Sequence, residues 1–271
     1  MVGLKEVRAY WESRSPGLKH SPHEVGTEEF FSDVERERYG DVFKYQYLTE
    51  VAEFDVHRGH AVLEVGVGLG TDILQFARNG AIAHGIDIAS RAVEVTAGRF
   101  RLDDRRGHFG QGSFTDIPFR DGVFDLVYSF GVLHHSEETQ EGIDEIFRVL
   151  KPGGRVIVMV YHKGFKYYVR KLFVYGILRG ELLSRSAQEI VSRHSEDFGD
   201  APLTKEFSRS QARRMFDAFE GLTLDCYRLD DYVNVRGAPV SPARTILPYG
   251  LYRRVENRFG WNLIIKGRKP G

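Results

Sequence analysis

The stretch AVLEVGVGLGTD, residues 61–72, passes from a short apolar run through a turn with three glycines into a helical pattern. Single residues separate Gly66, Gly68 and Gly70, whereas a dinucleotide-binding turn has the spacing GxGxxG. Glu64 lies just before the turn, and its carboxylate would repel the pyrophosphate of a dinucleotide. We therefore expect a ligand that carries an ammonium group and no phosphate.

A second acidic residue, Asp87, ends the apolar stretch AIAHGIDI and lies about 20 residues beyond Gly66. An acid at that place accepts hydrogen bonds from the hydroxyls of a ribose. Together with the glycine turn, it predicts a nucleoside with a positively charged amino-acid tail. Two simpler interpretations stay open: Asp87 as the N-cap of the next helix, and the glycines as an ordinary tight turn.

On both sides of this turn, apolar runs alternate with patterns of helical period. The expected strands are 61–65, 81–88, 122–130 and 155–162, and the expected helices are 71–79, 90–100 and 139–150. Asn79-Gly80, an N-cap at Ser90 and a Lys-Pro-Gly-Gly turn at 151–154 mark the helix ends. Because the strands are apolar on both faces, the alternation predicts a parallel sheet with helices on both faces.

This pattern divides the chain into four parts. We expect an N-terminal helical lid at 1–54, a cofactor-binding core at 55–163, an inserted helical and loop lid at 164–207, and completion of the core sheet by 208–271. The aromatic composition of the two lids distinguishes them from the core.

Outside the core, the local predictions are less regular. We expect a single amphipathic helix at 34–54 and a polar loop at 192–204. In the C-terminal part we expect a helix at 208–219 and strands at 222–229 and 261–267, with an irregular stretch between the two strands.

Composition limits the possible binding partners and the expected cellular compartment. Lys and Arg number 38, as do Asp and Glu, so the net charge offers no global reason to bind nucleic acid or an anionic bilayer. A local basic patch stays possible. The single cysteine, Cys226, is expected to be a buried thiol. Without a membrane-length apolar stretch or a signal-peptide pattern, we expect a soluble cytoplasmic protein with no membrane association.

Five motifs in order carry a resemblance to a known family. They are EVGVGLGTD (64–72), GIDIA (85–89), GSFTDIPF (112–119), DGVFDLVYSFGVLHHS (121–136) and IFRVLKPGGRVIV (146–158). In this order they resemble the class I S-adenosylmethionine-dependent methyltransferases, and most of all the small-molecule, methyltransferase-11-like branch. The resemblance implies a Rossmann-like α/β fold, with a seven-stranded, mostly parallel sheet whose last strand runs antiparallel.

The resemblance also implies a set of cofactor contacts. The three glycines would let the backbone approach the methionine part of S-adenosyl-L-methionine, and Glu64 would steer its amino group. Asp87 would bind the ribose. The remaining contacts would come from Ile88 on the adenine face, Ser113 and Phe114 at the adenine edge, and the backbone carbonyls of Ser129 and Phe130 at the ammonium. The family commonly has an Asp-Ala pair where this chain has Ser113 and Phe114. No metal is expected.

Catalytic candidates follow the fourth and fifth strands. His134 and His135 leave the sheet at the edge where ligands bind, and an imidazole suits a general base. We favour His134 as the base and a structural role for His135, although both could merely orient the loop. Tyr161 and His162 end the next strand, with His162 the next candidate base and Tyr161 a substrate contact.

The lids are expected to form the acceptor pocket. Tyr10 and Trp11 in the first lid, and the aromatic residues of 164–207, would suit an apolar or aromatic small molecule. Two other classes of function stay open. The chain could bind the cofactor and catalyse a non-methylating reaction such as cyclisation or decarboxylation, or it could bind the cofactor without turnover. Methyl transfer to a macromolecule is disfavoured by the neutral charge and the bulky lids.

Overall fold

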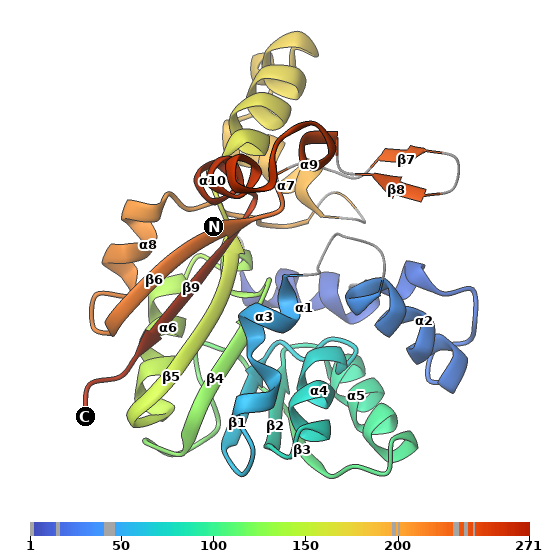
Figure 1. Cartoon of the computed structure of the whole chain (residues 1–271), viewed down its shortest axis with the longest axis vertical. Helices are drawn as coiled ribbons and strands as arrows, with labels where there is room; N and C mark the ends of the chain where they lie inside the picture. Colours follow the sequence, from blue (N-terminus) through green and yellow to red (C-terminus); the bar gives the residue numbers. More distant parts are fainter. Residues whose placement is uncertain are drawn as a thin grey trace.

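The computed structural model describes residues 3–14, 17–40, 47–196, 199, 201–229, 233–235, 238–240 and 242–271. Its centre is a seven-stranded sheet with the strand order β3-β2-β1-β4-β5-β9-β6 (Figure 1). The strands are β1 (Ala61–Val65), β2 (Ile82–Asp87), β3 (Gly107–Gln111), β4 (Phe124–Phe130), β5 (Leu150–Tyr161), β6 (Glu220–Tyr227) and β9 (Asn262–Arg268). All pairs from β3 to β5 are parallel, and β9 is antiparallel to both β5 and β6, which confirms the predicted fold class.

The strand order creates a topological switch point between β1 and β4. The chain runs outward from β1 through β2 to β3 and then returns to pair β4 with β1, so the connections leave the sheet on opposite sides. Ligands of open α/β sheets bind in the crevice at such a point, beyond the carboxyl ends of the strands. Val65, Asp87 and Phe130 are the last residues of three of these strands.

Helices cover both faces of the sheet, as predicted. One face packs on α3 (Leu48–Ala52) and α4 (Thr71–Arg78), and the other packs on α6 (Thr139–Val149) and α8 (Arg209–Met215). Side chains alternate between the faces: Val62 joins the core under α4, whereas Leu63 joins the core under α6. α5 (Ser90–Leu102) contributes Phe100 to the α4 side.

The N-terminal part is not the single helix predicted at 34–54. It comprises α1 (Leu4–Ser13), α2 (Glu28–Tyr39), α3 and the 3-10 turns η1 (Leu18–His20) and η2 (Phe54–Val56). α2 ends because Gly40 turns to an extended conformation, and α3 ends at Glu53, which has φ of 55°. Residues 41–46 of the predicted helix lie outside the described residues.

The start of α5 differs from the prediction and explains the position of α1. Ser90 is the first helical residue and Ala89 is the N-cap, which has no side chain that can accept a hydrogen bond. The carboxylate of Glu12, at the end of α1, instead accepts hydrogen bonds from the backbone N–H groups of Ser90 and Arg91 at 3.0 and 3.1 Å. Capping by a distant residue therefore ties α1 to the helix that follows Asp87.

Three further local predictions need correction. In the insert, η4 (Lys166–Leu178) is a π-helix, η5 (Glu181–Leu183) is a 3-10 turn, and α7 (Ala187–Ser195) runs into the expected polar loop. A capping box of Ser186 and Glu189 begins α7. The expected irregular stretch contains the hairpin β7 (Val233–Val235) and β8 (Ala238–Val240), then α9 (Pro242–Ile246) and α10 (Tyr249–Phe259). The Lys-Pro-Gly-Gly stretch does follow the end of α6, but as an irregular start of β5.

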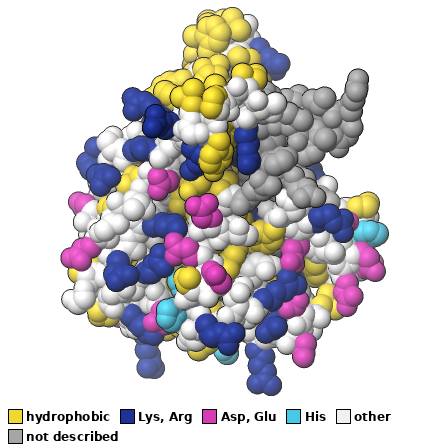
Figure 2. Space-filling model, in the orientation of Figure 1, with side chains coloured by type: hydrophobic (Ala, Val, Ile, Leu, Met, Phe, Trp, Pro, Cys, Tyr) yellow, Lys and Arg dark blue, Asp and Glu magenta, His cyan; other side chains and the backbone are white. Residues whose placement is uncertain are grey.

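The surface is uneven in character. Acidic and basic side chains are interspersed over the lower part of the visible face, whereas apolar side chains gather at the top, around the π-helix η4 (Figure 2). No helix within the described part of the chain is long and apolar enough to cross a membrane.

Candidate functional site

The glycine turn after β1 has a backbone that only glycine adopts readily. Gly66, Gly68 and Gly70 have φ of 83°, 52° and 69°. A Cβ atom on Gly66 would lie 2.2 Å from Cγ2 of Val132, whereas one on Gly68 would meet no atom within 4 Å. Gly66 therefore permits close packing against the loop after β4, and Gly68 leaves open space at the turn.

Asp87 joins this turn to the start of the next helix. Its Oδ2 accepts a hydrogen bond from the Gly68 N–H at 3.0 Å, and its Oδ1 accepts one from the Ala89 N–H at 2.9 Å. Burial raises the pKa of Asp87 above its ordinary value. Because each carboxylate oxygen has two lone pairs, both oxygens keep acceptor capacity for a ligand.

A pocket lies between these residues and α1. Eight residues singled out from the sequence line it: Trp11, Gly66, Gly68, Asp87, Ile88, Phe114, Phe130 and His135. Eight others also line it and were not singled out: Val7, Val65, Ile86, Ala89, Ala92, Gly112, Gly131 and Val132. Five of them, Val65, Ile86, Ala89, Gly131 and Val132, lie at or just beyond the carboxyl ends of β1, β2 and β4, so the strand ends could have indicated them.

Glu64 lies behind the turn and does not line the pocket. It is 4% exposed, and its Oε2 accepts a hydrogen bond from the Ile73 N–H at 2.9 Å. Burial, together with the negative charge of Asp72, raises its pKa well above the ordinary value. In this structure Glu64 thus holds the first turn of α4 against β1.

Asp72 is the centre of a buried network that the sequence did not indicate. Its carboxylate accepts hydrogen bonds from the Arg38 guanidinium and from the hydroxyls of Tyr39 and Tyr128. Burial acts against the charged form, but Arg38 and these hydrogen bonds keep the pKa of Asp72 below its ordinary value. Arg38 also lies over the ring of Phe130. The network fastens α2 to α4 and to a wall of the pocket.

Four other predicted cofactor or substrate residues serve local structure. Ser129 is buried and its hydroxyl donates a hydrogen bond to the Val65 carbonyl at 3.0 Å. Ser113 is hydrogen-bonded to Thr115 at 2.7 Å within a tight turn. Gly70 is the N-cap of α4, and the hydroxyl of Tyr10 donates to the Gly199 carbonyl at 2.9 Å. None of the four lines the pocket.

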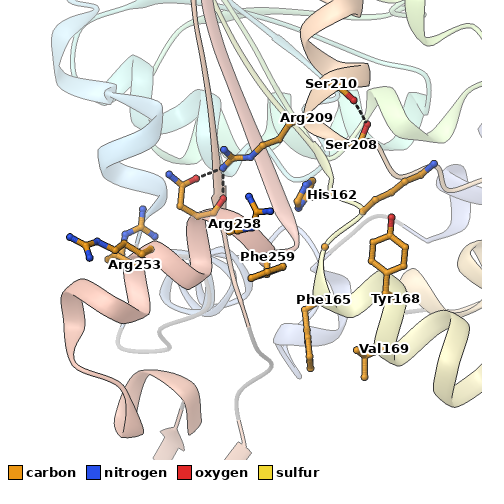
Figure 3. Close-up of a pocket in the computed structure, with 14 residues that line it drawn as sticks. His162, Phe165, Tyr168, Val169, Ser208, Arg209, Ser210, Arg253, Arg258 and Phe259 are labelled. Atoms are coloured by element: carbon orange, nitrogen blue, oxygen red, sulfur yellow. Dashed lines mark hydrogen bonds between the residues drawn. The ribbon is translucent and has the colours of Figure 1, made fainter.

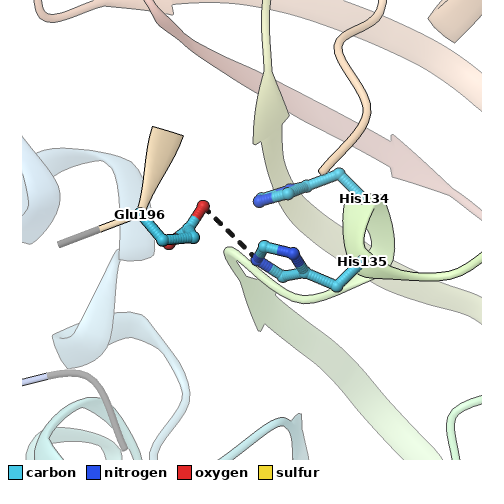
Figure 4. Close-up of side chains that lie close together, drawn as sticks. All are labelled: His134, His135 and Glu196. Atoms are coloured by element: carbon cyan, nitrogen blue, oxygen red, sulfur yellow. Dashed lines mark ion pairs between the residues drawn. The ribbon is translucent and has the colours of Figure 1, made fainter. Parts of the chain in front are cut away.

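His134 and His135 form the 3-10 turn η3 (Leu133–His135) directly after β4, and both are buried (Figure 4). The Nδ1–H of His135 donates to the Leu203 carbonyl at 2.9 Å, which leaves its Nε2 as an acceptor, 3.7 Å from Oε1 of Glu196. Neither ring nitrogen of His134 has a hydrogen-bond partner within the described residues. Burial, then the neighbouring His135 and Lys205, hold the pKa of His134 well below its ordinary value.

Five rings form a continuous row that begins in the pocket. The ring centroids of Trp11 and His135 are 4.9 Å apart, those of His135 and His134 4.2 Å, those of His134 and Tyr161 4.1 Å, and those of Tyr161 and Trp261 4.6 Å. The row therefore extends from the pocket to the start of β9.

Part of the chain matches a known protein family. Residues 63–158 match the family model described as a methyltransferase domain. This matched part of the chain is similar to the class I S-adenosylmethionine-dependent methyltransferases. It is 40% identical over 101 residues to a demethylmenaquinone methyltransferase of Clavibacter sepedonicus, a match that covers 37% of this chain and 40% of that protein. The chain thus spans about two fifths of the length of that relative.

Solved structures share the fold of this chain. The magnesium protoporphyrin IX methyltransferase of Synechocystis PCC 6803 aligns over 98% of this chain and 100% of its own, with a TM-score of 0.59 and 15% identity. The [4+2]-cyclase SpnF aligns over 97% of this chain and 95% of its own, with a TM-score of 0.55 and 19% identity. At these identities the likeness shows the fold alone.

The donor groups of the pocket fit the cofactor that this methyltransferase family uses. The open space at Gly68 and the remaining acceptor capacity of Asp87 suit a ribose, while the apolar Ile88 and Phe114 suit the faces of an adenine. The family thus implies S-adenosylmethionine as cofactor.

The two histidines of η3 also bear on the expectation that no metal binds. Atoms of His134, His135 and Glu196 lie within 4.8 Å of one another, and such donors can hold a divalent cation. Ligands of a tetrahedral zinc ion are only about 3.4 Å apart, so the group would have to contract to bind one. The absence of a metal stays a prediction.

His162 does not share the site of the other histidines. Tyr161 is the last residue of β5 and faces the row of rings, whereas the next residue, His162, shares a hollow with Arg209 at the start of α8. There it lies 3.5 Å from Cys226 Sγ and lines a separate hollow (Figure 3). The prediction that His162 serves the same site as His134 is therefore wrong, whereas the prediction that Cys226 is a buried thiol is confirmed.

Proposed function

We propose that this methyltransferase transfers the methyl group of S-adenosylmethionine to an oxygen, nitrogen or carbon atom of a small molecule with an aromatic or apolar face. The continuity between the pocket and the row of rings carries this proposal, because Trp11 and His135 belong to both. A flat acceptor would lie along the rings, with its reacting atom toward the pocket.

For the cofactor, we assign the ribose to Asp87, the adenine faces to Ile88 and Phe114, and the methionine part to the turn at Gly66 and Gly68. The cofactor supplies a methyl group on a positively charged sulfur, which the acceptor displaces in line, so the protein mainly has to align the acceptor and exclude water. Glu64 would act on the amino group only through the backbone that it holds.

Binding of the cofactor requires α1 to move outward. The pocket holds about 110 Å³, below the roughly 300–1,000 Å³ of ordinary cofactor pockets. Val7 and Trp11 of α1 form part of its wall, and the contact of Glu12 with Ser90 and Arg91 joins this helix to α5. We infer that α1 is a lid that opens at this contact and closes over the bound cofactor.

An acceptor hydroxyl or amine must lose a proton as the new bond forms. We assign this step first to Nε2 of His135, because this ring lines the pocket and its Nδ1–H is held by the Leu203 carbonyl. His134, which the sequence favoured, lies one ring deeper and is the second candidate. Glu196 would stabilise the imidazolium that forms on His135.

The test of this function is a screen for methyl transfer. The full chain is incubated with S-adenosylmethionine and a panel of phenols, quinols and aromatic amines, the quinols being suggested by the name of the Clavibacter relative. Formation of S-adenosylhomocysteine together with a product heavier by one methyl group supports the proposal.

Two other results would refute methyl transfer. An acceptor that is consumed without S-adenosylhomocysteine would indicate a non-methylating reaction, as in the cyclase that shares the fold. Tight cofactor binding with no turnover of any acceptor would indicate a binding protein.

A further inference from the structure

Exposed apolar side chains are concentrated in two segments. Of the 15 large hydrophobic side chains that are exposed in the described residues, eight lie in 165–183 and four lie in 246–259. Those of the first segment are Phe165, Tyr168, Val169, Phe173, Ile177, Leu178, Leu182 and Leu183, and those of the second are Ile246, Tyr249, Leu251 and Phe259. We call these twelve side chains the apical surface.

The apical surface is too exposed to belong to the core. Ile177 is 61% exposed, Leu178 66% and Leu183 93%. Single exposed hydrophobic residues are normal, but a contiguous group of this kind marks a contact with another apolar phase or molecule. Figure 1 shows η4, in yellow, extending away from the sheet beyond α7 and α10, and Figure 2 shows apolar side chains covering this part.

Basic residues are frequent in the first segment of the apical surface. Between residues 163 and 185 the chain has six basic residues, Lys163, Lys166, Arg170, Lys171, Arg179 and Arg185, and one acidic residue, Glu181. The charge of the chain as a whole is zero, so this excess is local. Lys166 and Lys171 are buried, so the part of this excess that reaches the surface comes from Lys163, Arg170, Arg179 and Arg185.

A basic hollow lies at the base of the apical surface (Figure 3). It has a volume of about 830 Å³ and is lined by Phe165, Tyr168, Val169 and Phe259 of the apical surface together with Lys163, Arg209, Arg253, Arg254 and Arg258. No acidic residue lines it in the described part of the chain. Arg209 and Arg253 are bound to Asn257 and Glu256, whereas Arg254 and Arg258 are exposed.

These observations together favour one kind of partner. A second copy of the chain would bring the same positive charge to the contact, and like charges oppose association. A nucleic acid would match the charge but would leave Ile177, Leu178 and Leu183 exposed to water. An anionic bilayer offers both an acyl region for the apolar side chains and headgroup phosphates for the arginines.

We propose that the apical surface binds the face of an anionic lipid bilayer, with the side chains of η4 and η5 in the acyl boundary and Arg254 and Arg258 at the headgroups. The contact needs no spanning helix. It is independent of the proposed methyl transfer, since it involves neither the cofactor pocket nor the row of rings.

The experiment is flotation of the full chain with vesicles of phosphatidylcholine alone or of equal parts phosphatidylcholine and phosphatidylglycerol. We expect binding to the anionic vesicles only, and weaker binding at high salt. Replacing Ile177, Leu178 and Leu183 with Ser should lower the partition coefficient at least tenfold. Arg254→Gln and Arg258→Gln should each lower it about fivefold.

The matched control replaces Val56, Ile82 and Leu102 with Ser, the three large hydrophobic residues that are exposed outside the apical surface in the described residues. This variant should float like the wild type, and circular dichroism should show both triple variants to be folded. Equal loss in the two triple variants, or no binding of the wild type to anionic vesicles, would overturn the proposal. A lipid-free dimer that the apical triple variant abolishes, without vesicle binding by the wild type, would assign the surface to a second copy instead.

Discussion

Replacement of Asp87 by Ala tests the assignment of the ribose. The carboxylate already accepts hydrogen bonds from Gly68 and Ala89 at 3.0 and 2.9 Å, and each oxygen has one lone pair left for a ribose hydroxyl. Hydrogen bonds to a charged group contribute about 1.5–3 kcal/mol each to stability. Because the buried carboxylate also has to lose water, we expect a net loss of about 2–3 kcal/mol in cofactor binding.

That loss corresponds to a Kd for S-adenosylhomocysteine about 30- to 150-fold higher than in the wild type. Isothermal titration calorimetry measures it directly, and the product is the suitable ligand because it has no methyl group to transfer. Asp87→Asn, which keeps one acceptor oxygen, should lie between Asp87→Ala and the wild type.

Asp125→Ala is the matched control. Asp125 also accepts a hydrogen bond from a backbone N–H, that of Ala61 at 2.9 Å. It lies near the start of β4, at the opposite end of the strands from the pocket. Its loss should leave the Kd unchanged. If Asp87→Ala binds the ligand as tightly as the wild type, with an unchanged circular dichroism spectrum, the ribose is bound elsewhere and the reasoning fails.

Four further predictions concern stability, catalysis, pH and metals. Arg38→Met leaves the buried carboxylate of Asp72 without its cation and should lower the free energy of unfolding in urea by about 3 kcal/mol, whereas Arg36→Met, at an exposed pair with Asp33, should have little effect. His135→Ala should lower kcat about a hundredfold or more, with the Kd for S-adenosylhomocysteine nearly unchanged. If His134→Ala lowers kcat more than His135→Ala does, His134 is the base instead. Burial raises the pKa of Glu206 to about 8, so the folded chain keeps the proton on this carboxyl after the unfolded chain has lost it. The free energy of unfolding should therefore fall by up to about 1.4 kcal/mol per pH unit between pH 4.5 and 8. Unfolding curves of Glu206→Gln should lack this fall. Finally, treatment with a chelator should leave both activity and melting temperature unchanged, and a stoichiometric zinc or iron content by elemental analysis would contradict this.

Secondary structure was predictable where hydrophobic pattern and turn chemistry agree. β1, β2, β4 and β5 are apolar runs, and α4 ends at Asn79-Gly80 as expected because Gly80 has φ of 91°. β3 was missed because its sequence, GHFGQ, has a single large apolar residue and forms the edge of the sheet. α10 was missed although Tyr252, Val255 and Phe259 recur along it at helical spacing.

The sequence by itself determined the fold class and the position of the pocket. Glycines at the end of β1 and an acid at the end of β2 are local features, and the parallel connection of the strands brings such ends to one edge. Only the tertiary structure decided which contacts each of the two histidines makes. His135 takes its orientation from Leu203 and faces Glu196, both from the insert, while His134 lies deeper, against Tyr161. Such contacts depend on how segments more than 60 residues apart pack together, as for Leu203 and His135, and no periodicity within one segment records that packing.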